Sequence, residues 1–189
     1  PPSYVCSSPL CSAALRFLAR LNTITFLRKV RSVQLVAFST SSSNATLPLT
    51  IETTEKEIGV SREISSFVLP LGATINMDGT ALYQAVATMF IAQVLVGDLT
   101  LATQFGIVLT ATLASIGAAG VPSAGIIILI VVLQGALPPS VDAAAGIALF
   151  LGVDRILDMC RTALNVTGDM TAAAVIALSE VDLIEPPGA

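Results

Sequence analysis

Apolar residues dominate the chain from about residue 20 to residue 180, and polar interruptions divide them into segments. Residues 20–39 predict a helix that is apolar on one side and basic near its start, and a second short helix is expected to reach about residue 57. The polar cluster 39–46 between them is expected at the tip of a hairpin. The acidic and basic residues of the stretch 52–63 predict a solvated loop that leads into the next helix.

Two more interruptions divide the apolar sequence that follows. Residues 64–96 form an apolar segment that is broken at ATINMDGTA. Residues 102–137 are broken at ASIGAAGVPSAG, where glycines and a proline discourage a continuous helix. The two arms of this second segment are shorter than the roughly 20 residues of a standard span, so a re-entrant hairpin fits better. A long final helix is expected over about 142–180.

These segments form a weak internal repeat, because an interrupted hairpin followed by a longer helix with polar residues at mid-length occurs twice. Discontinuous segments at corresponding places in two repeats are typical of the binding sites of secondary transporters. We therefore predict an all-α membrane protein in which two re-entrant helical hairpins and two long transmembrane helices, one of them broken, form a transporter core domain. Residues 19–180 would form this domain, with residues 1–18 poorly ordered or out of context and residues 181–189 a polar tail.

Composition supports a membrane protein. Hydrophobic residues make up 54% and charged residues 12% of the chain, whereas soluble domains carry roughly 25% charged residues. Basic residues cluster before residue 32 and no acid precedes Glu52, which favours a cytoplasmic location for this early segment of a multi-pass protein in the cell (inner) membrane. Three cysteines without metal-ligand spacing and the absence of histidine argue against zinc and structural disulfides. No motif suggests a cofactor, and the small basic cluster does not favour nucleic acid.

Polar residues run down one face of the predicted final helix. Steps of four, three, four and four residues separate these positions, so their side chains fall within about 80° of arc. Acids and an arginine in apolar surroundings are destabilising by a few kcal/mol each unless they are paired or hydrated, so this face is expected to line a binding site for a charged solute. The positions are Asp154, Asp158, Arg161, Asn165 and Asp169.

Four motifs carry a resemblance to a known family: SSSNATLPLT, LPLGATINMDGTALYQ, ASIGAAGVPSAG and GVDRILDMCRTALNVTGD. In this order, the chain resembles the glutamate/aspartate–sodium symporters, the dicarboxylate/amino acid:cation symporter family, over residues 20–180. The resemblance implies sodium-coupled uptake of aspartate or glutamate by an elevator-type alternating-access mechanism, with no enzymatic activity. It also implies that these residues form the C-terminal transport domain. In the full-length protein, an N-terminal scaffold would make a homotrimer within the membrane lipid.

The same resemblance implies the site residues. A carboxylate such as Asp158 can pair with a substrate ammonium, and Arg161 can hold a carboxylate with two hydrogen bonds. Carboxylate and amide oxygens beside an unwound, glycine-rich backbone suit a hard cation. The implied substrate contacts are Ser42, Ser43, Thr80, Ala119, Gly120, Val121, Asp158, Arg161, Thr162 and Asn165. The implied sodium ligands are Gly72, Thr74, Asn76, Asp78, Asn165 and Asp169.

Several alternatives remain open. The motif around Asn76 could be a kinked helix with a hydrogen-bonded amide, and Asp158 and Arg161 could form an ion pair within their helix. Arg161 favours an acidic over a neutral amino acid, and Asp158 argues against C4-dicarboxylates, which have no amine to pair. Gln84 stands where animal members carry a glutamate, which favours a prokaryote-like symporter.

Two further readings differ in kind. The chain could be a transport-inactive fragment. It could also be an intramembrane aspartyl protease, whose chemistry uses buried aspartates. The G-x-G-D pattern of those proteases is absent, because Val166 stands where its first glycine belongs.

Overall fold

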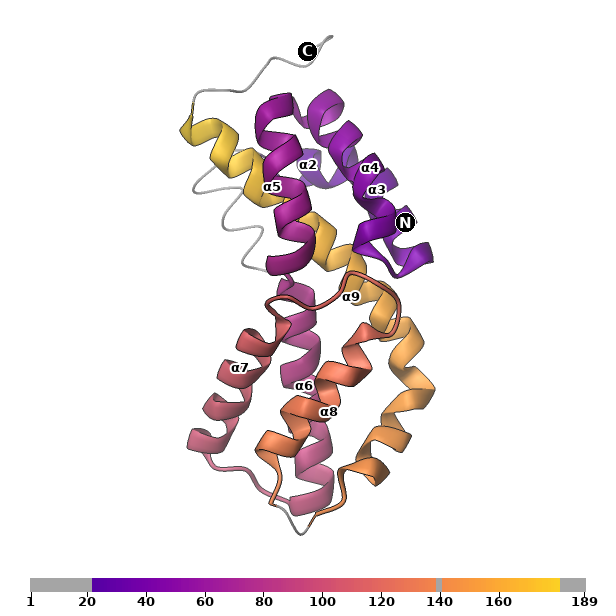
Figure 1. Ribbon diagram of the computed structural model, residues 1–189, viewed down its shortest axis with the longest axis vertical. Helices are drawn as coiled ribbons and strands as arrows, with labels where there is room; N and C mark the ends of the chain where they lie inside the picture. The colour runs from indigo at the N-terminus through magenta and orange to yellow at the C-terminus, as the bar shows by residue number, and fades with distance from the viewer. Residues whose placement is uncertain (1–21, 139–140, 181–189) are drawn as a thin grey trace.

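The computed structural model describes residues 22–138 and 141–180, and these residues form helices without β-strands (Figure 1). The predictions for residues 1–18 and 181–189 lie outside the described residues. The elements are α2 (Thr23–Lys29), α3 (Arg31–Thr40), α4 (Ser43–Thr53), the π-helical turn η2 (Thr54–Ile58), α5 (Arg62–Ile75), α6 (Asp78–Val96), α7 (Leu101–Ser115), α8 (Ala124–Ala136) and α9 (Ala143–Ser179).

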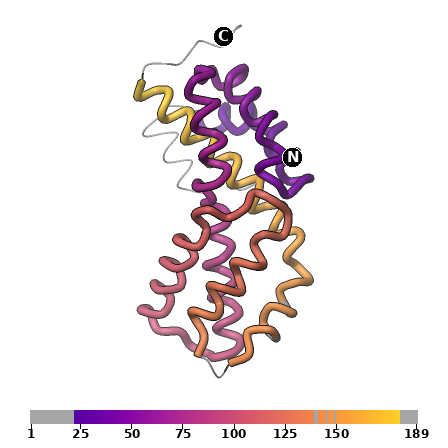
Figure 2. The backbone as a smooth tube through the Cα atoms, in the orientation of Figure 1, coloured from indigo at the N-terminus to yellow at the C-terminus, as the bar shows by residue number. Residues whose placement is uncertain are grey.

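The long helix α9 extends along most of an elongated molecule, and the other helices form two groups, one along each of its halves (Figures 1 and 2). Helices α3, α4 and α5 contact its C-terminal half, and α6 and α8 contact its N-terminal half, whereas α7 packs against α6 and α8, and α2 against α3 and η2. Each half has its own apolar core: one includes Phe26, Leu69 and Met170, and the other includes Ile91 and Leu133. Three of the non-helical connections meet between these two cores, at mid-length of the molecule (Figure 1).

Three breaks in the helices create this central region. Asn76 and Met77 leave the helical conformation between α5 and α6, with ψ angles of 61° and 57°. Between α3 and α4, Ser41 adopts a left-handed conformation, and the Ser42 hydroxyl caps α4 by accepting a hydrogen bond from the Ala45 N–H at 3.1 Å. The third break is the loop 116–123 between α7 and α8. All three coincide with the polar and glycine-rich interruptions of the sequence, and the helices predicted over 64–96, 102–137 and 142–180 are confirmed.

Among the predictions about the first part of the chain, one is wrong and another is wrong in part. The helix expected over residues 20–39 is interrupted at Val30, so α2 and α3 are separate. The second short helix, expected to reach about residue 57, is confirmed as far as Ile58, and within the stretch 52–63, predicted as a solvated loop that leads into the next helix, only residues 59–61 are non-helical. Its charged side chains lie on the exposed face, where Lys56 pairs with Glu52 one turn earlier at 2.7 Å. Ile58 is buried on the other side, so the charges mark a helix face rather than a loop.

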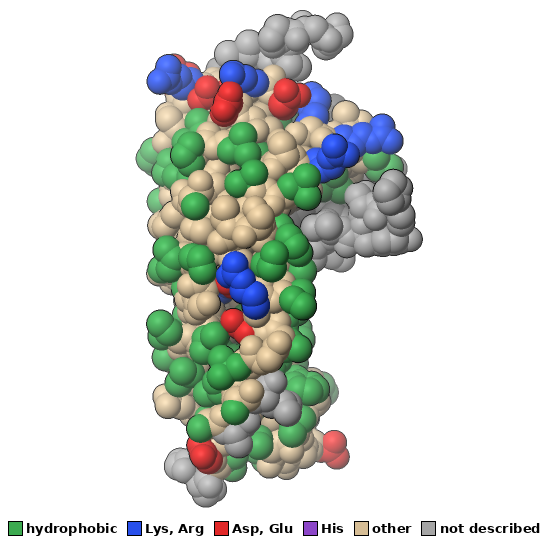
Figure 3. Space-filling model, turned by 90° about the vertical axis from the view of Figure 1, so that its right-hand side faces the viewer, with side chains coloured by type: hydrophobic (Ala, Val, Ile, Leu, Met, Phe, Trp, Pro, Cys, Tyr) green, Lys and Arg blue, Asp and Glu red, His purple; other side chains and the backbone are tan. Residues whose placement is uncertain are grey.

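Large apolar side chains are exposed at many places on the surface of the molecule. Large side chains such as Phe67, Leu101 and Phe105 are exposed. Figure 3 shows most charged side chains of one face at the two ends of the molecule, with a small charged patch at mid-length. Within the described residues, only the stretch Arg62–Val96 is both long and apolar enough to cross a membrane, and α7 and α8 are shorter apolar helices.

We expect a substitution of Gly59 by alanine to destabilise the end of η2. Gly59 has a φ angle of 87°, a left-handed conformation that disfavours residues with a Cβ atom by about 1–2 kcal/mol. The melting temperature in detergent, measured by circular dichroism, should fall by about 2–8 °C. Gly106→Ala is the matched control, because a Cβ atom there meets nothing within 4 Å. Equal melting temperatures for the two variants would contradict the helical ending at Gly59.

Candidate functional site

The polar face predicted for the final helix is buried inside the molecule. Its five residues lie on α9 and are between 2% and 7% exposed. Charged groups with so little access to water require ionic or hydrogen-bonding partners. The partners come from α5, α6 and the loop 116–123, so the face of α9 is the floor of the candidate site. The five residues are Asp154, Asp158, Arg161, Asn165 and Asp169.

Asp158 and Arg161 form the charged centre of this floor. The Arg161 guanidinium donates to Asp158 Oδ1, so the ion pair considered as an alternative is present. The second oxygen of Asp158 accepts the Ser123 backbone N–H at 3.0 Å. Arg155 approaches the same oxygen at 3.9 Å, but its side chain is 57% exposed. The Arg161 Nε atom is buried and has no hydrogen-bond partner among the described residues.

Helix α6 supplies neighbours of Arg161 that the site prediction did not include. The Tyr83 ring lies under the guanidinium, with its centroid 5.7 Å from Cζ. Its hydroxyl donates to Asp154 Oδ1 at 2.5 Å. Gln84 Nε2 donates to the Gly125 carbonyl of α8 at 2.7 Å. In the sequence, the motif LYQ and the position of Asp154 four residues before Asp158 could have pointed to these neighbours. Neither pattern indicates which helices face each other.

Gly125 is a place of close approach between α8 and the charged centre. A Cβ atom built on Gly125 would lie 3.1 Å from Arg161 Cζ and 3.4 Å from Tyr83 Cε1. The absence of a side chain at Gly125 therefore allows α8 to pack against the guanidinium.

The break between α5 and α6 lies against the C-terminal part of the same α9 face. Asn76 Nδ2 donates to Asp169 Oδ1 at 2.9 Å. Asn165 Oδ1 accepts the backbone N–H groups of Gly79 at 2.8 Å and Thr80 at 3.3 Å. The Asn165 amide also donates to the Thr80 hydroxyl at 3.1 Å. Asn165 therefore satisfies backbone groups at the start of α6, where a helix leaves its first N–H groups without partners.

The carboxyl groups of Asp169 and Asp78 each lie close to the backbone of a glycine near this break. A Cβ atom on Gly72 would lie 2.5 Å from Asp169 Oδ1, and one on Gly168 would lie 3.0 Å from both carboxylate oxygens of Asp78. No group of three His, Cys, Asp or Glu side chains among the described residues could hold a metal ion. A cation here would need amide, hydroxyl or backbone oxygens in addition to the carboxylates, which is the donor set of a hard monovalent or divalent cation.

The loop 116–123 is hydrogen-bonded to both breaks. Ser42 Oγ donates to the Gly120 carbonyl at 2.7 Å. The Gly117 N–H donates to the Thr74 carbonyl at 2.9 Å, which joins the loop to the end of α5. Together with the bond from Ser123 to Asp158, these contacts hold the loop over the face of α9.

Some predicted site residues do not point toward the charged centre. Ala119 and Val121 are exposed on the loop. The Thr162 hydroxyl donates to the Asp158 carbonyl of its own helix at 2.9 Å, and the Thr74 hydroxyl donates to the Leu71 carbonyl at 2.8 Å. Ser43 is buried in the first turn of α4.

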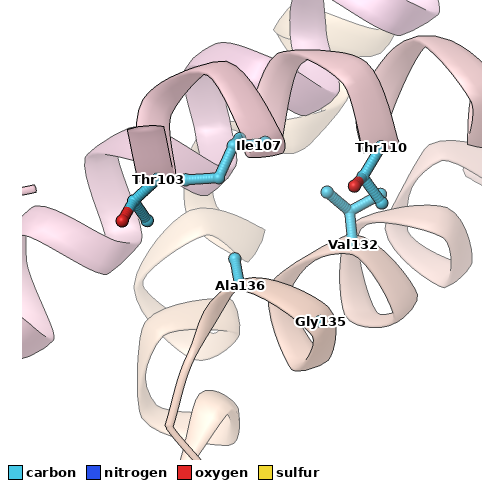
Figure 4. A pocket seen from close by; sticks show the side chains of 7 residues that line it. Thr103, Ile107, Thr110, Val132, Gly135 and Ala136 are labelled. Carbon is cyan, nitrogen blue, oxygen red and sulfur yellow. The ribbon is translucent and has the colours of Figure 1, made fainter. Parts of the chain in front are cut away.

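A separate cavity of about 200 Å³ lies between α7 and α8 (Figure 4). None of the predicted site residues lines this cavity. Its walls are small or apolar, so it offers no charged group to a ligand. The lining residues are Thr103, Gly106, Ile107, Thr110, Val132, Gly135 and Ala136.

The chain is similar to known proteins over most of its length. Residues 8–179 match the sodium:dicarboxylate symporter family. The chain belongs to this family. The resemblance inferred from the four motifs is therefore confirmed, and family membership supports a multi-pass membrane protein.

Several relatives are excitatory amino acid transporters. The chain is 47% identical over 161 residues to excitatory amino acid transporter 5 of Homo sapiens, which covers 85% of the chain and 28% of the relative. It is 47% identical over 155 residues to an excitatory amino acid transporter of Caenorhabditis elegans, covering 82% and 30%. It is 46% identical over 159 residues to excitatory amino acid transporter 1 of Rattus norvegicus, covering 84% and 28%.

The matches cover less than a third of each relative's length, between 28% and 30% in these three. These relatives are animal proteins, and the expectation of a prokaryote-like symporter, based on Gln84, stays a prediction.

We expect Asn165→Leu to destabilise the protein by about 1–3 kcal/mol, because it leaves the buried Thr80 N–H without an acceptor and the Gly79 N–H with Asp78 Oδ1 alone. Denaturant unfolding in detergent measures the loss. Thr88→Val is the matched control: Thr88 is buried on α6, and its hydroxyl has no partner among the described residues. A loss no larger than that of the control would show that Asn165 does not hold the start of α6.

Proposed function

We propose that the chain forms the substrate- and ion-binding core of a sodium-coupled symporter for an acidic amino acid, aspartate or glutamate. The observation that carries this proposal is the burial of Asp158 and Arg161 side by side beneath the loop 116–123. A buried carboxylate suits the α-ammonium of an amino acid, and a neighbouring guanidinium suits its side-chain carboxylate. The substrate would replace the internal ion pair with two intermolecular ones.

Sodium would bind at the break between α5 and α6. Asp78 and Asp169 bring two carboxyl groups to this break, and in their ionised form these groups would repel an anionic substrate unless cations neutralise them. Sodium ligands would include these carboxylates, the amide oxygens of Asn76 and Asn165, and backbone oxygens near Gly72 and Thr74. Sodium binding would then raise the substrate affinity, and this coupling free energy would let a sodium gradient drive uptake.

The two helix pairs α3/α4 and α7/α8 would be re-entrant hairpins, with the loop 116–123 acting as the gate. The serine-rich tip at Ser42 and Ser43 would bind the substrate's α-carboxylate, since helix N-termini attract anions. Backbone groups of Ala119, Gly120 and Val121 and polar groups of Thr80, Thr162 and Asn165 would complete the site. The closed domain would slide against an N-terminal scaffold of the full-length protein, an elevator-type movement within a homotrimer in the cell membrane.

Calorimetry with L-aspartate tests this proposal directly. Binding in sodium that disappears in potassium is expected for the protein in detergent. Arg161→Ala should weaken aspartate binding at least about 30-fold, because a buried charge pair is lost. Arg155→Ala is the matched control on the same helix, and its largely exposed side chain should change affinity by no more than about twofold.

The same titration separates the alternatives. Tighter binding of succinate than of aspartate would indicate a C4-dicarboxylate symporter, and tighter binding of L-serine would indicate a neutral amino acid symporter. A folded protein that binds none of these ligands in sodium would contradict the proposal.

We also expect Gly125→Ala to weaken aspartate binding by about tenfold, or 1.4 kcal/mol, with little effect on stability. The new methyl group would displace the flexible end of Arg161 from the Tyr83 ring rather than disturb the backbone. Gly135→Ala on the same helix is the control, since a Cβ atom there meets nothing within 4 Å. Unchanged affinity in Gly125→Ala, measured by the same calorimetry, would show that the guanidinium position is not needed.

A further inference from the structure

The tip of the loop 116–123 rests on Asn44, a residue outside the predicted site. The Gly120 carbonyl accepts the Asn44 backbone N–H at 3.2 Å in addition to the Ser42 hydroxyl. The side chain of Asn44 also lies close to Gly120. Its Oδ1 and Cγ atoms are 3.0 Å and 3.2 Å from the position that a Cβ atom on Gly120 would occupy. Backbone and side chain of Asn44 therefore both face Gly120.

Asn44 differs from the other residues that hold the loop. Gly117 is bound by the Thr74 carbonyl and Ser123 by the Asp158 carboxylate, and both acceptors belong to groups with a proposed role in binding sodium or substrate. Asn44 is exposed and uncharged. It lies in the first turn of α4, so its side-chain amide can contact the loop without itself being a charged ligand of the substrate or of sodium.

We infer that Asn44 is a positioning residue that seats Gly120 and sets how firmly the loop closes over the site. The inference rests on the proposed function, because loop closure affects affinity only if a ligand binds beneath the loop. When only the closed form holds the ligand tightly, the apparent dissociation constant rises as the closed fraction falls. The side chain of Asn44 thereby tunes substrate affinity without contacting the substrate.

A double-mutant cycle between the two residues tests this seat. Gly120→Ala should weaken sodium-dependent aspartate binding by about tenfold, because its methyl group meets the Asn44 amide. Combined with Asn44→Ser, whose side chain is shorter, the same substitution should weaken binding by no more than about threefold. The remaining loss reflects the Ala73 carbonyl, 3.3 Å from the same methyl position. Equal losses in both backgrounds would overturn the inference.

Gly106→Ala provides the control cycle. This glycine lies on α7 of the same helix pair, and a Cβ atom there meets nothing within 4 Å. It should show no coupling to Asn44→Ser. Coupling of similar size in this control would mean that Asn44 acts through general stability, and it would also overturn the inference.

Loop position can be followed without any substrate. Spin labels at exposed Ile116 and exposed Glu52, with the native cysteines replaced by serine, report the distance between the loop and α4. In sodium alone, Asn44→Ser should broaden this distance distribution toward longer values, whereas Gly106→Ala should leave it unchanged. An unchanged distribution in Asn44→Ser would overturn the inference. Failure of aspartate to bind the unsubstituted protein would instead overturn the proposed function, so the two failures are distinguishable.

Discussion

The buried charges of α9 cannot remain unpaired in apolar surroundings, and the rest of the molecule is arranged to provide their partners. Burying an isolated charge is destabilising enough that native structures pair or hydrate it. Here Asp154 is met by the Tyr83 hydroxyl of α6, Asp158 by the loop before α8, and Asp169 by Asn76 at the end of α5. Three separate segments are thus tied to one helix by its polar face, and the two apolar cores lie on either side of that face.

Broken helices are what make this pairing possible. A continuous helix uses its own backbone groups, whereas a helix break at membrane depth leaves N–H and carbonyl groups that protein, ions or water must satisfy. The structure uses such groups repeatedly: the N–H groups at the start of α6 bind Asn165, and the Thr74 carbonyl at the end of α5 binds the Gly117 N–H. The breaks therefore stabilise the fold, and under the proposed function the carbonyl oxygens near them would also bind a cation.

The breaks and the polar face could be predicted because they depend on local rules. Glycine, proline and polar clusters interrupt apolar helices, and the 3.6-residue period places Asp154 to Asp169 on one face. The contacts of Tyr83 with Asp154 and of Asn44 with Gly120 join residues 71 and 76 positions apart, and no local pattern encodes which helices meet. The loop predicted over residues 52–63 is too long for a different reason: exposed charges resemble a loop, although the burial of Ile58 shows that the segment before residue 59 is helical. Residue roles came from the family resemblance rather than from spacing.

The loop 116–123 is hydrogen-bonded to groups that a charged amino acid would also need for its binding under the proposed function. This overlap links the position of the loop to the occupancy of the site. Ser123 binds an Asp158 oxygen, and Gly120 takes the Ser42 hydroxyl. Under the proposed function, an entering substrate competes for the first contact through its ammonium and for the second through its α-carboxylate. Contacts of the loop with Asn44 and Thr74 involve no charged group, so they can persist while the substrate takes the others. A ligand shifts a conformational equilibrium only by its differential affinity for the two states. The uncharged contacts therefore set the closed population on which the charged substrate acts.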